Sequence, residues 1–164
     1  RNALSQIESN FDLVLMDSPP QLGFLTISGM AAANSIIVPL TPSMLDVSST
    51  AQFLELAGAY MGVIEEAGAE LRYDHFKFLI TRDEPTDVPS QQLTSFMRAL
   101  FQERVMSATA LKSTAISDAT MLKQSIYEVV RSEMTRATYD RAKSSMDAVG
   151  AEVEAMVRQT WGRK

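Results

Sequence analysis

Three mostly apolar runs along the chain predict buried β-strands. They cover residues 11–16, 35–40 and 76–81, and none of them alternates polar and apolar positions as a half-exposed strand would. Continuous apolar runs suit strands that helices cover on both faces, as in a parallel sheet. The first run ends in an acid, Asp17. The Ser-Pro-Pro sequence after it stops the strand, because proline has no N–H to donate to a ladder.

Between and after these runs, apolar residues recur three and four positions apart, which predicts amphipathic helices. Strands that alternate with helices predict an α/β fold, with a doubly wound, mostly parallel sheet and right-handed crossovers. No internal repeat or linker is visible, so the 164 residues are expected to form one domain. The expected helices cover residues 22–33, the stretch from Ser43 to Gly68, the stretch from Ser90 to Phe101, and residues 136–161.

Local signals mark the ends of several helices. Ser43 and Asp46 fit a capping box, Gly68 suits a helix end, and Ser90 can cap the helix that follows it. The remaining sequence predicts shorter elements: a helix end within residues 1–9, a loop at 82–89, a short strand within 104–108, a loop at 109–117 and a partly helical stretch at 119–130.

The composition narrows the possible classes of protein. Apolar residues make up 46% of the chain, enough for a core of ordinary size, and the lack of cysteine excludes disulfides and thiolate metal sites. No apolar run reaches the ~18 residues that cross a bilayer, and no signal peptide is visible. We therefore expect a cytoplasmic protein with no membrane partner.

The net charge of −5 is unevenly distributed. Residues 1–97 hold 4 basic and 12 acidic side chains, a net −8, whereas residues 98–164 hold 11 basic and 8 acidic side chains, a net +3. The basic excess indicates a weak electrostatic footprint for DNA in the C-terminal part. Ordinary surface variation explains the same excess, so charge alone leaves DNA binding open.

Asp17 is the first candidate for chemistry. A carboxylate at the C-terminal end of a central parallel strand lies in the crevice where open α/β sheets bind ligands. An apolar strand that ends in Asp is also the Walker B pattern of ATPases, in which the acid holds the Mg²⁺ shell. The bare pattern is weak, because many buried strands end in an Asp that only caps nearby backbone N–H groups.

A longer string around Asp17, DSPPQLGFLTISGMAAA, resembles the Walker B and switch region of the ParA family of partition ATPases. The resemblance is especially to the RepA proteins of plasmid replication and partition operons. The resemblance continues through VPLTPSMLDVSSTAQFL, FLITRDEPTD, LKSTAISDA and the closing TYDRAKSSMDAVGAEVEAMVRQTWGRK, and so covers nearly all of the chain. It implies a P-loop NTPase-like fold of the ParA and MinD class.

The phosphate-binding loop of that class is absent from the sequence. None of the seven glycines lies in G-x-x-x-x-G-K-[ST], and the family's own glycine-rich variant is missing too. In the family this loop lies N-terminal to the Walker B strand. Residues 1–164 therefore resemble the C-terminal part of a ParA-type ATPase domain, ending in a long helix at about 136–161. Alone, such a chain is expected neither to bind ATP tightly nor to hydrolyse it.

The resemblance implies nucleotide-handling roles for four residues. Asp17 matches the acid that orients a Mg²⁺-bound water, and Pro19 belongs to the switch segment that responds to the γ-phosphate. Thr81 and Arg82 match the strand end beside the adenine, and residues 108–117 match a second segment that borders the base. Relatives often have Asn where Arg82 stands. The arginine therefore suits stacking on the base, with a solvated side chain as the alternative.

The resemblance also implies contact with DNA of any sequence. Phosphate binding needs only positive charges on a common surface. Isolated basic residues on a helix are usually solvated, so surface residues without a function are the alternative. The position of Lys112 matches a basic position of the relatives, and the other candidates are Lys123, Arg136, Arg141 and Lys143.

Together these features imply a nucleotide switch. In the family, ATP and Mg²⁺ order the segment after the Walker B acid and close a homodimer, which binds nonspecific DNA on the nucleoid. A ParB-type centromere-binding protein stimulates hydrolysis, and RepA relatives repress their own operon through an N-terminal region. A non-catalytic α/β interaction module, in which Asp17 is structural, is one alternative. A MinD-like membrane-positioning ATPase is another, and the acidic residues of the last helix argue against it.

Overall fold

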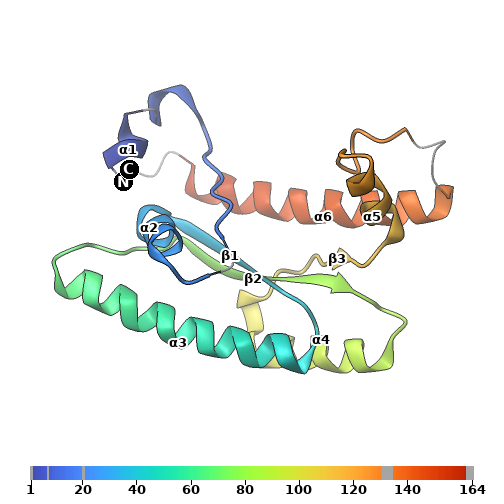
Figure 1. The fold of residues 1–164 in the computed structure, drawn as a ribbon, viewed down its shortest axis with the longest axis horizontal. Helices are drawn as coiled ribbons and strands as arrows, with labels where there is room; N and C mark the ends of the chain where they lie inside the picture. The colour runs from blue at the N-terminus through green and yellow to red at the C-terminus, as the bar shows by residue number, and fades with distance from the viewer. Residues whose placement is uncertain (1, 7, 20, 131–134, 162–164) are drawn as a thin grey trace. The chain divides into compact units, whose positions relative to one another are not determined.

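The computed structural model describes residues 2–6, 8–19, 21–130 and 135–161 (Figure 1). The helices are α1 (Asn2–Ser5), α2 (Phe24–Ala32), α3 (Met44–Glu66), α4 (Val88–Phe101), α5 (Thr114–Met121) and α6 (Arg136–Thr160). The strands are β1 (Ser35–Leu40), β2 (His75–Asp83) and β3 (Ala110–Leu111), and two short 3₁₀ helices are η1 (Glu8–Asn10) and η2 (Gln102–Arg104).

The three strands form one sheet in the order β1-β2-β3. β2 and β3 run parallel, with Thr81 opposite Ala110 and Asp83 opposite Leu111. The strand expected within 104–108 is reduced to a single parallel bridge between Val105 and Phe78. Strands that alternate with helices and pair in parallel confirm the α/β class.

The chain divides into two compact units. One comprises residues 1–36 and 49–75, and so holds α1, α2 and most of α3. The other comprises residues 37–48 and 76–164, and holds nearly all of the sheet together with α4, α5 and α6. We call them the first and the second unit.

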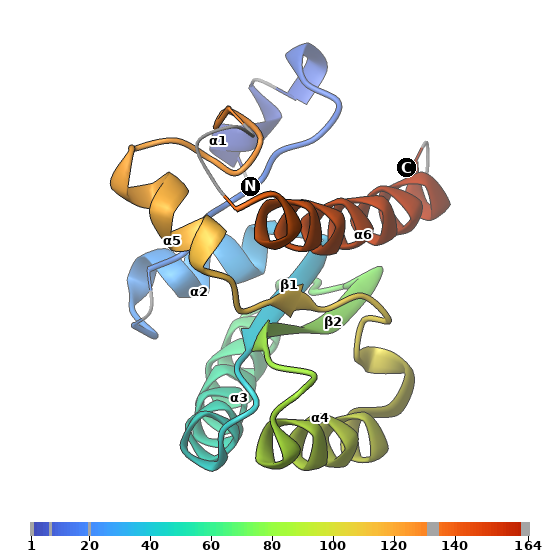
Figure 2. The same ribbon diagram turned by 90° about the vertical axis from the view of Figure 1, so that its right-hand side faces the viewer.

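The core of the second unit lies on both faces of its strands. In Figure 2, α4 covers one side of β2 and β3, and α6 covers the other. The most deeply buried large side chains are Phe78, Ile80, Met97 and Met106. Phe78 also packs on Phe101 of α4, with 4.3 Å between the ring centroids. On the α6 side, a smaller cluster joins Tyr139 and Ala142 to Ala115 and Ile126.

Two of the expected helix ends are confirmed. The N–H of Asp46 donates to Ser43 Oγ at 3.1 Å, and the Ser43 hydroxyl donates to the Asp46 carboxylate at 2.7 Å, at the start of α3. At its end, Gly68 has a φ of +93° and donates to the carbonyl of Glu65, while Ala69 donates to that of Ile64. These two bonds form a Schellman motif, which needs a residue with positive φ.

The start of α4 differs from the expectation. Asp87, and not Ser90, is the N-cap: the Asp87 carboxylate accepts from the N–H of Ser90 at 2.9 Å. The reason is Pro89, which favours the first turn of a helix and so lies inside α4 rather than before it. The Ser90 hydroxyl is buried without a hydrogen-bond partner among the described residues.

The strand expected at residues 11–16 is not formed. Residues 11–19 belong to neither a helix nor a strand, and their side chains are exposed, Leu15 to 80%. A strand is stable only when its backbone groups pair with a neighbour, and no described segment pairs with this run. Pro20, the second proline of the expected stop signal, lies outside the described residues.

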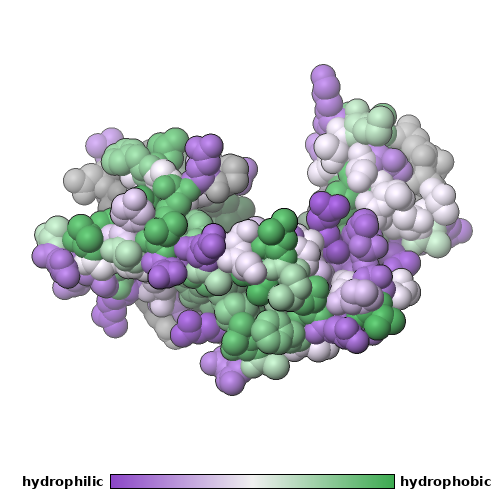
Figure 3. Space-filling model, turned by 60° about the horizontal axis from the view of Figure 1, so that its bottom comes forward, coloured by the Kyte–Doolittle hydropathy of each residue, from purple (hydrophilic) through white to green (hydrophobic). Residues whose placement is uncertain are grey.

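Other differences concern the shorter elements and the helix faces. The loop expected at 109–117 contains β3 and the start of α5, and α5 ends at Met121 rather than continuing to 130. α6 buries Tyr139, Ala142, Val149 and Met156, whereas Trp161, which follows it, is 59% exposed. On the face shown in Figure 3, apolar side chains reach the surface between polar ones. In α4, for instance, Phe96 and Leu100 are about half exposed.

No helix in the described part of the chain is long and apolar enough to span a membrane.

Candidate functional site

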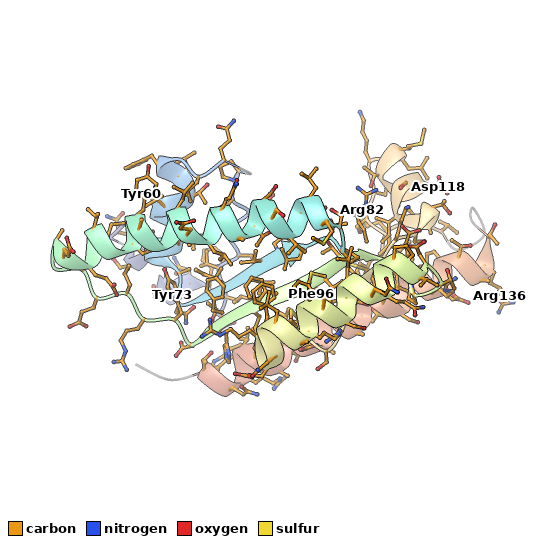
Figure 4. The ribbon with its side chains drawn as sticks, turned by 90° about the horizontal axis from the view of Figure 1, so that it is seen from below. Tyr60, Tyr73, Arg82, Phe96, Asp118 and Arg136 are labelled. Carbon is orange, nitrogen blue, oxygen red and sulfur yellow. The ribbon has the colours of Figure 1, made fainter. Side chains whose placement is uncertain are left out.

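The C-terminal end of β2 carries an unusual backbone. Arg82 has a φ of +53°, and the pairing with β3 slips between Thr81 and Asp83. A positive φ is uncommon for a residue with a side chain, and such strained positions occur often at ligand sites. The Arg82 side chain is exposed at this strand end (Figure 4), whereas the Thr81 hydroxyl donates inward to the carbonyl of Leu40 at 3.3 Å.

Asp83 is the most buried acid of this region, and the sequence analysis did not select it. Its side chain accepts a hydrogen bond from the Thr109 hydroxyl at 2.8 Å, and its carbonyl accepts from the N–H of Lys112 at 3.0 Å. Asp83 is only 8% exposed. The signal that could have found it is the one used for Asp17, an apolar strand that ends in an acid. Thr109 has no comparable local signal.

Two of the predicted DNA-binding residues meet beside β3. Lys112 and Arg141 both line a pocket of about 230 Å³, together with Leu111, Ser113, Thr114, Thr138 and Ala142. The Lys112 ammonium also pairs with the Glu84 carboxylate at 2.7 Å, and both side chains are about half exposed. The Ser113 hydroxyl accepts from the N–H of Ala115 at 3.2 Å and caps α5 at the edge of this pocket.

A second, shallower depression lies between β3 and α6. Its lining residues are Thr109, Leu111, Asp140, Arg141, Ser144, Ser145 and Ala148. The hydroxyl of Ser145, which is buried, accepts from the N–H of Leu111 at 2.9 Å and donates to the carbonyl of Thr109 at 3.1 Å. Ser145 therefore joins α6 to the same segment that contacts Asp83.

Lys143 is engaged within the protein rather than free for a ligand. Its ammonium lies 3.0 Å from the Asp147 carboxylate and 5.1 Å from the centre of the Tyr127 ring. The hydrogen bond between the two side chains raises the pKa of Lys143 and lowers the pKa of Asp147. Both groups are exposed, so the pair contributes little to stability and is screened by salt.

The other three candidates for DNA binding are more accessible to a ligand. Lys123 follows α5 with a φ of +56°, Arg136 is the first residue of α6 (Figure 4), and Arg141 lies one turn further along. All three are exposed, and none forms an ion pair with another residue in the described ranges. α6 as a whole carries four basic and four acidic residues, so its surface is of mixed charge.

Asp17 and Pro19 belong to the first unit. The Asp17 carboxylate is exposed, and the turn after it is held by Thr26 of α2. The buried Thr26 hydroxyl donates to the carbonyl of Gln21 at 2.6 Å and lies 3.2 Å from that of Pro19. Sequence reasoning did not select Thr26, although it lies in the string that carries the family resemblance.

Asp17 offers a single carboxylate as a candidate metal ligand. Within the part of the chain that the structure describes, no three His, Asp or Glu side chains gather into a metal-binding group. Mg²⁺ is usually held by one or two carboxylates together with waters and substrate phosphates, rather than by a cage of protein ligands. One exposed acid such as Asp17 fits such a shell.

Comparisons with known proteins give two kinds of similarity. Residues 1–62 match a family model described as an AAA domain. A solved structure described as a partition protein shares the fold, with a TM-score of 0.70 over 95% of this chain and 39% of that chain, at 17% identity.

Three relatives illustrate the sequence similarity. A putative replication protein A of Sinorhizobium fredii is 47% identical over 162 residues, and one of Rhizobium rhizogenes is 44% identical over 160 residues. These matches cover 99% and 98% of this chain but 40% of each relative. The chromosome-partitioning ATPase Soj of Thermus thermophilus is 29% identical over 114 residues, which is 68% of this chain and 43% of Soj.

The chain thus spans about 40% of the length of the curated relatives that it matches. The similarity to replication protein A extends over almost its whole length, and the string around Asp17 lies within the matched family model. By sequence, the chain is homologous to putative replication protein A and to the ParA and Soj partition proteins, and it shares the fold of a solved partition protein.

Proposed function

We propose that this chain supplies the Walker B acid, the switch segment and the base-bordering segment of an ATP-dependent plasmid-partitioning protein. The observation that carries the proposal is the family match over residues 1–62, which contains Asp17 and the turn that Thr26 holds. A relative that is named a chromosome-partitioning ATPase supports the same activity. The whole protein would act as a dimer that switches with its nucleotide.

Four residues would handle the nucleotide in this proposal. Asp17 orients a water of the Mg²⁺ shell, and Pro19 lies in the turn that responds to the γ-phosphate. Arg82 stacks on the base, because its guanidinium is planar and its strained backbone turns an exposed side chain outward at the end of β2. Thr81 belongs to the same strand end and positions its neighbour by its hydrogen bond to Leu40.

The glycine-rich loop that holds the phosphates would come from the part of the protein that this sequence does not include. The run at 11–16 supports this division, because its apolar side chains are exposed and its backbone has no strand partner among the described residues. A strand from the remaining part of the protein would pair with this run and bring Asp17 to the edge of a larger sheet.

DNA binding would rest on Arg136, Arg141 and Lys123, which are exposed and form no ion pair with the rest of the described chain. Lys112 and Lys143 are less suited, since Glu84 and Asp147 already neutralise them. A ParB-type protein would stimulate hydrolysis and release the complex from the nucleoid, and the whole protein would repress its own operon. These functions come from the family resemblance.

Calorimetric titration with Mg·ATP tests the nucleotide proposal, using a form of the protein that includes the glycine-rich loop. Asp17→Ala should lower ATP hydrolysis by about 10–100-fold, as is typical when a residue that orients a metal-bound water is lost. Asp12→Ala removes an exposed acid from the same segment and should leave hydrolysis unchanged. No heat of binding by the unmodified protein, or equal activity of the two variants, would contradict the proposal.

The salt dependence of binding to nonspecific DNA tests the second part. Arg141→Ala should weaken binding to every sequence alike and reduce the slope of log K against log salt by about one. Arg158→Ala, on the same helix but paired with Glu154 at 2.6 Å, is the matched control and should change the slope less. Equal slopes for the two variants would remove Arg141 from the DNA interface.

A further inference from the structure

β3 is the last strand in the sheet order, yet its outer edge is not left open. An edge strand presents unpaired N–H and C=O groups on the side away from its neighbour. The N–H of Lys112 points toward β2 and donates to the carbonyl of Asp83, so the N–H of Leu111 and the carbonyl of Thr109 point away from β2. Ser145 of α6 satisfies both of these outward groups with one hydroxyl, at 2.9 Å and 3.1 Å.

A second side chain of α6 acts in the same way two turns further along. The two carboxylate oxygens of Glu152 accept from the N–H groups of Ser107 and Ala108, at 2.9 Å and 2.7 Å. On the α4 side, the guanidinium of Arg98 donates to the carbonyls of Met106 and Ser107, at 3.0 Å and 3.1 Å. Within the described residues, side chains of α4 and α6, and not a fourth strand, therefore bond to the groups of residues 106–109 and 111 that do not pair with β2.

Residues 106–111 extend to the C-terminal end of β2, where Arg82 is exposed. Thr109 accepts from Ser145 through its carbonyl and donates its hydroxyl to Asp83, which is next to Arg82. Lys112 follows Leu111 in the chain, and both residues line the same pocket. A shift of α6 would act through these hydrogen bonds on residues 107–109 and 111, and Lys112 is the next residue along the chain.

We propose that Ser145 and Glu152 are positioning residues, which set the geometry of residues 107–112 and thereby the subsite for the nucleotide base. This inference rests on the proposed nucleotide binding. It assigns a role to two residues of the last helix that touch no nucleotide themselves. It also predicts that their loss weakens recognition of the base and leaves recognition of the phosphates unchanged.

The test combines amide hydrogen exchange with nucleotide binding, in a form of the protein that includes the glycine-rich loop. Ser145→Ala should speed exchange at Leu111 by about tenfold, and Glu152→Gln should do so at Ser107 or Ala108, since each substitution removes an acceptor of these N–H groups. Both variants should raise the KM for Mg·ATP several-fold with kcat within about twofold, and leave the affinity for inorganic triphosphate unchanged. Ser145→Thr keeps the hydroxyl and should restore both properties.

Ser144→Ala and Glu154→Gln are the matched controls, because both residues are exposed on the same helix and neither bonds to residues 107–112. Exchange and KM that are the same in the variants and in their controls would overturn the inference. So would a loss of protection without a change in KM, or an equal loss of affinity for ATP and triphosphate. If the unmodified protein binds no ATP, the proposed function itself fails, and the inference with it.

Discussion

The carboxylate of Asp83 and the hydroxyl of Thr109 are joined by a 2.8 Å hydrogen bond between the ends of β2 and β3. The two residues are 26 positions apart in the chain, and Asp83 is almost fully buried. A buried charged group depends strongly on each of its donors, because it has little water to replace them. This bond therefore fixes the strand end at which Arg82 is exposed.

Thr109→Val keeps the shape of the side chain and removes the donor. We expect the free energy of unfolding to fall by about 1–3 kcal/mol, because the Asp83 carboxylate is left short of a partner. Urea denaturation measures the change. Thr109→Ser, which retains the hydroxyl, should lose less than half as much, and an equal loss in both variants would contradict a specific role of the hydroxyl.

Thr26→Val should loosen the turn that follows Asp17. The substitution removes the hydrogen bond to the carbonyl of Gln21 and the contact with that of Pro19, at a cost of about 1 kcal/mol. Limited proteolysis with mass spectrometry should then show faster cleavage between residues 17 and 23. Thr26→Ser is the control, and cleavage at the same rate in Thr26→Val and the unmodified protein would contradict the expectation.

Tyr73 should make stability fall at alkaline pH. Its hydroxyl donates to the carbonyl of Met30 at 3.0 Å, and burial, aided by the negative charge of Glu65, raises the pKa of Tyr73. The folded protein then holds this proton more tightly than the unfolded chain does. The stabilising contribution is complete below the unfolded pKa of about 10, and it is lost as the pH rises through the higher folded pKa.

Urea denaturation at pH 8 and at about pH 10.5 measures this effect. Tyr73→Phe should lose about 1 kcal/mol at pH 8 and show a smaller further decrease at the higher pH than the unmodified protein. Tyr60→Phe, which removes a hydroxyl from an exposed position of α3, should follow the unmodified protein. The same pH dependence in both variants would exclude Tyr73 as the cause.

Gly68→Ala should destabilise the end of α3 through its backbone alone. The residue has a φ of +93°, and a Cβ built there meets no atom within 4 Å, so the expected loss of about 1 kcal/mol comes only from the left-handed conformation. Gly150→Ala, within α6 and equally unobstructed, should instead stabilise the protein by about 0.5–1 kcal/mol. Thermal unfolding of the two variants gives opposite shifts if this reasoning is right.

Local rules predicted those elements whose stability is mostly local. The apolar run at 35–40 forms β1 with the expected ends, and Ser43, Asp46 and Gly68 begin and end α3 as their chemistry requires. The prediction for the cap of α4 was wrong, because Asp87 and Ser90 lie on either side of the Val88-Pro89 pair and the position of the proline decides between them. A rule that places proline in the first turn of a helix predicts Asp87 as the N-cap.

The sequence was less informative where structure depends on distant partners. The run at 11–16 has the composition of a strand, but a ladder needs a second segment, and none of the described segments supplies one. The contacts of Ser145 and Glu152 with residues 107–111 join positions 34 to 45 residues apart, and no periodicity marks them in advance. Lys112 and Lys143 were reasonable candidates for DNA binding by type, and only the structure shows the acids that neutralise them.

The exposed run at 11–16 also decides how the 164-residue chain behaves in the test tube. Five of its six side chains are large and apolar, each at least 40% exposed, with Asp12 as the only charge. Segments of this composition adhere to one another as intermolecular β-structure. Concentrated samples of the chain should therefore become turbid on standing, and a form in which this run is covered should stay clear and monodisperse.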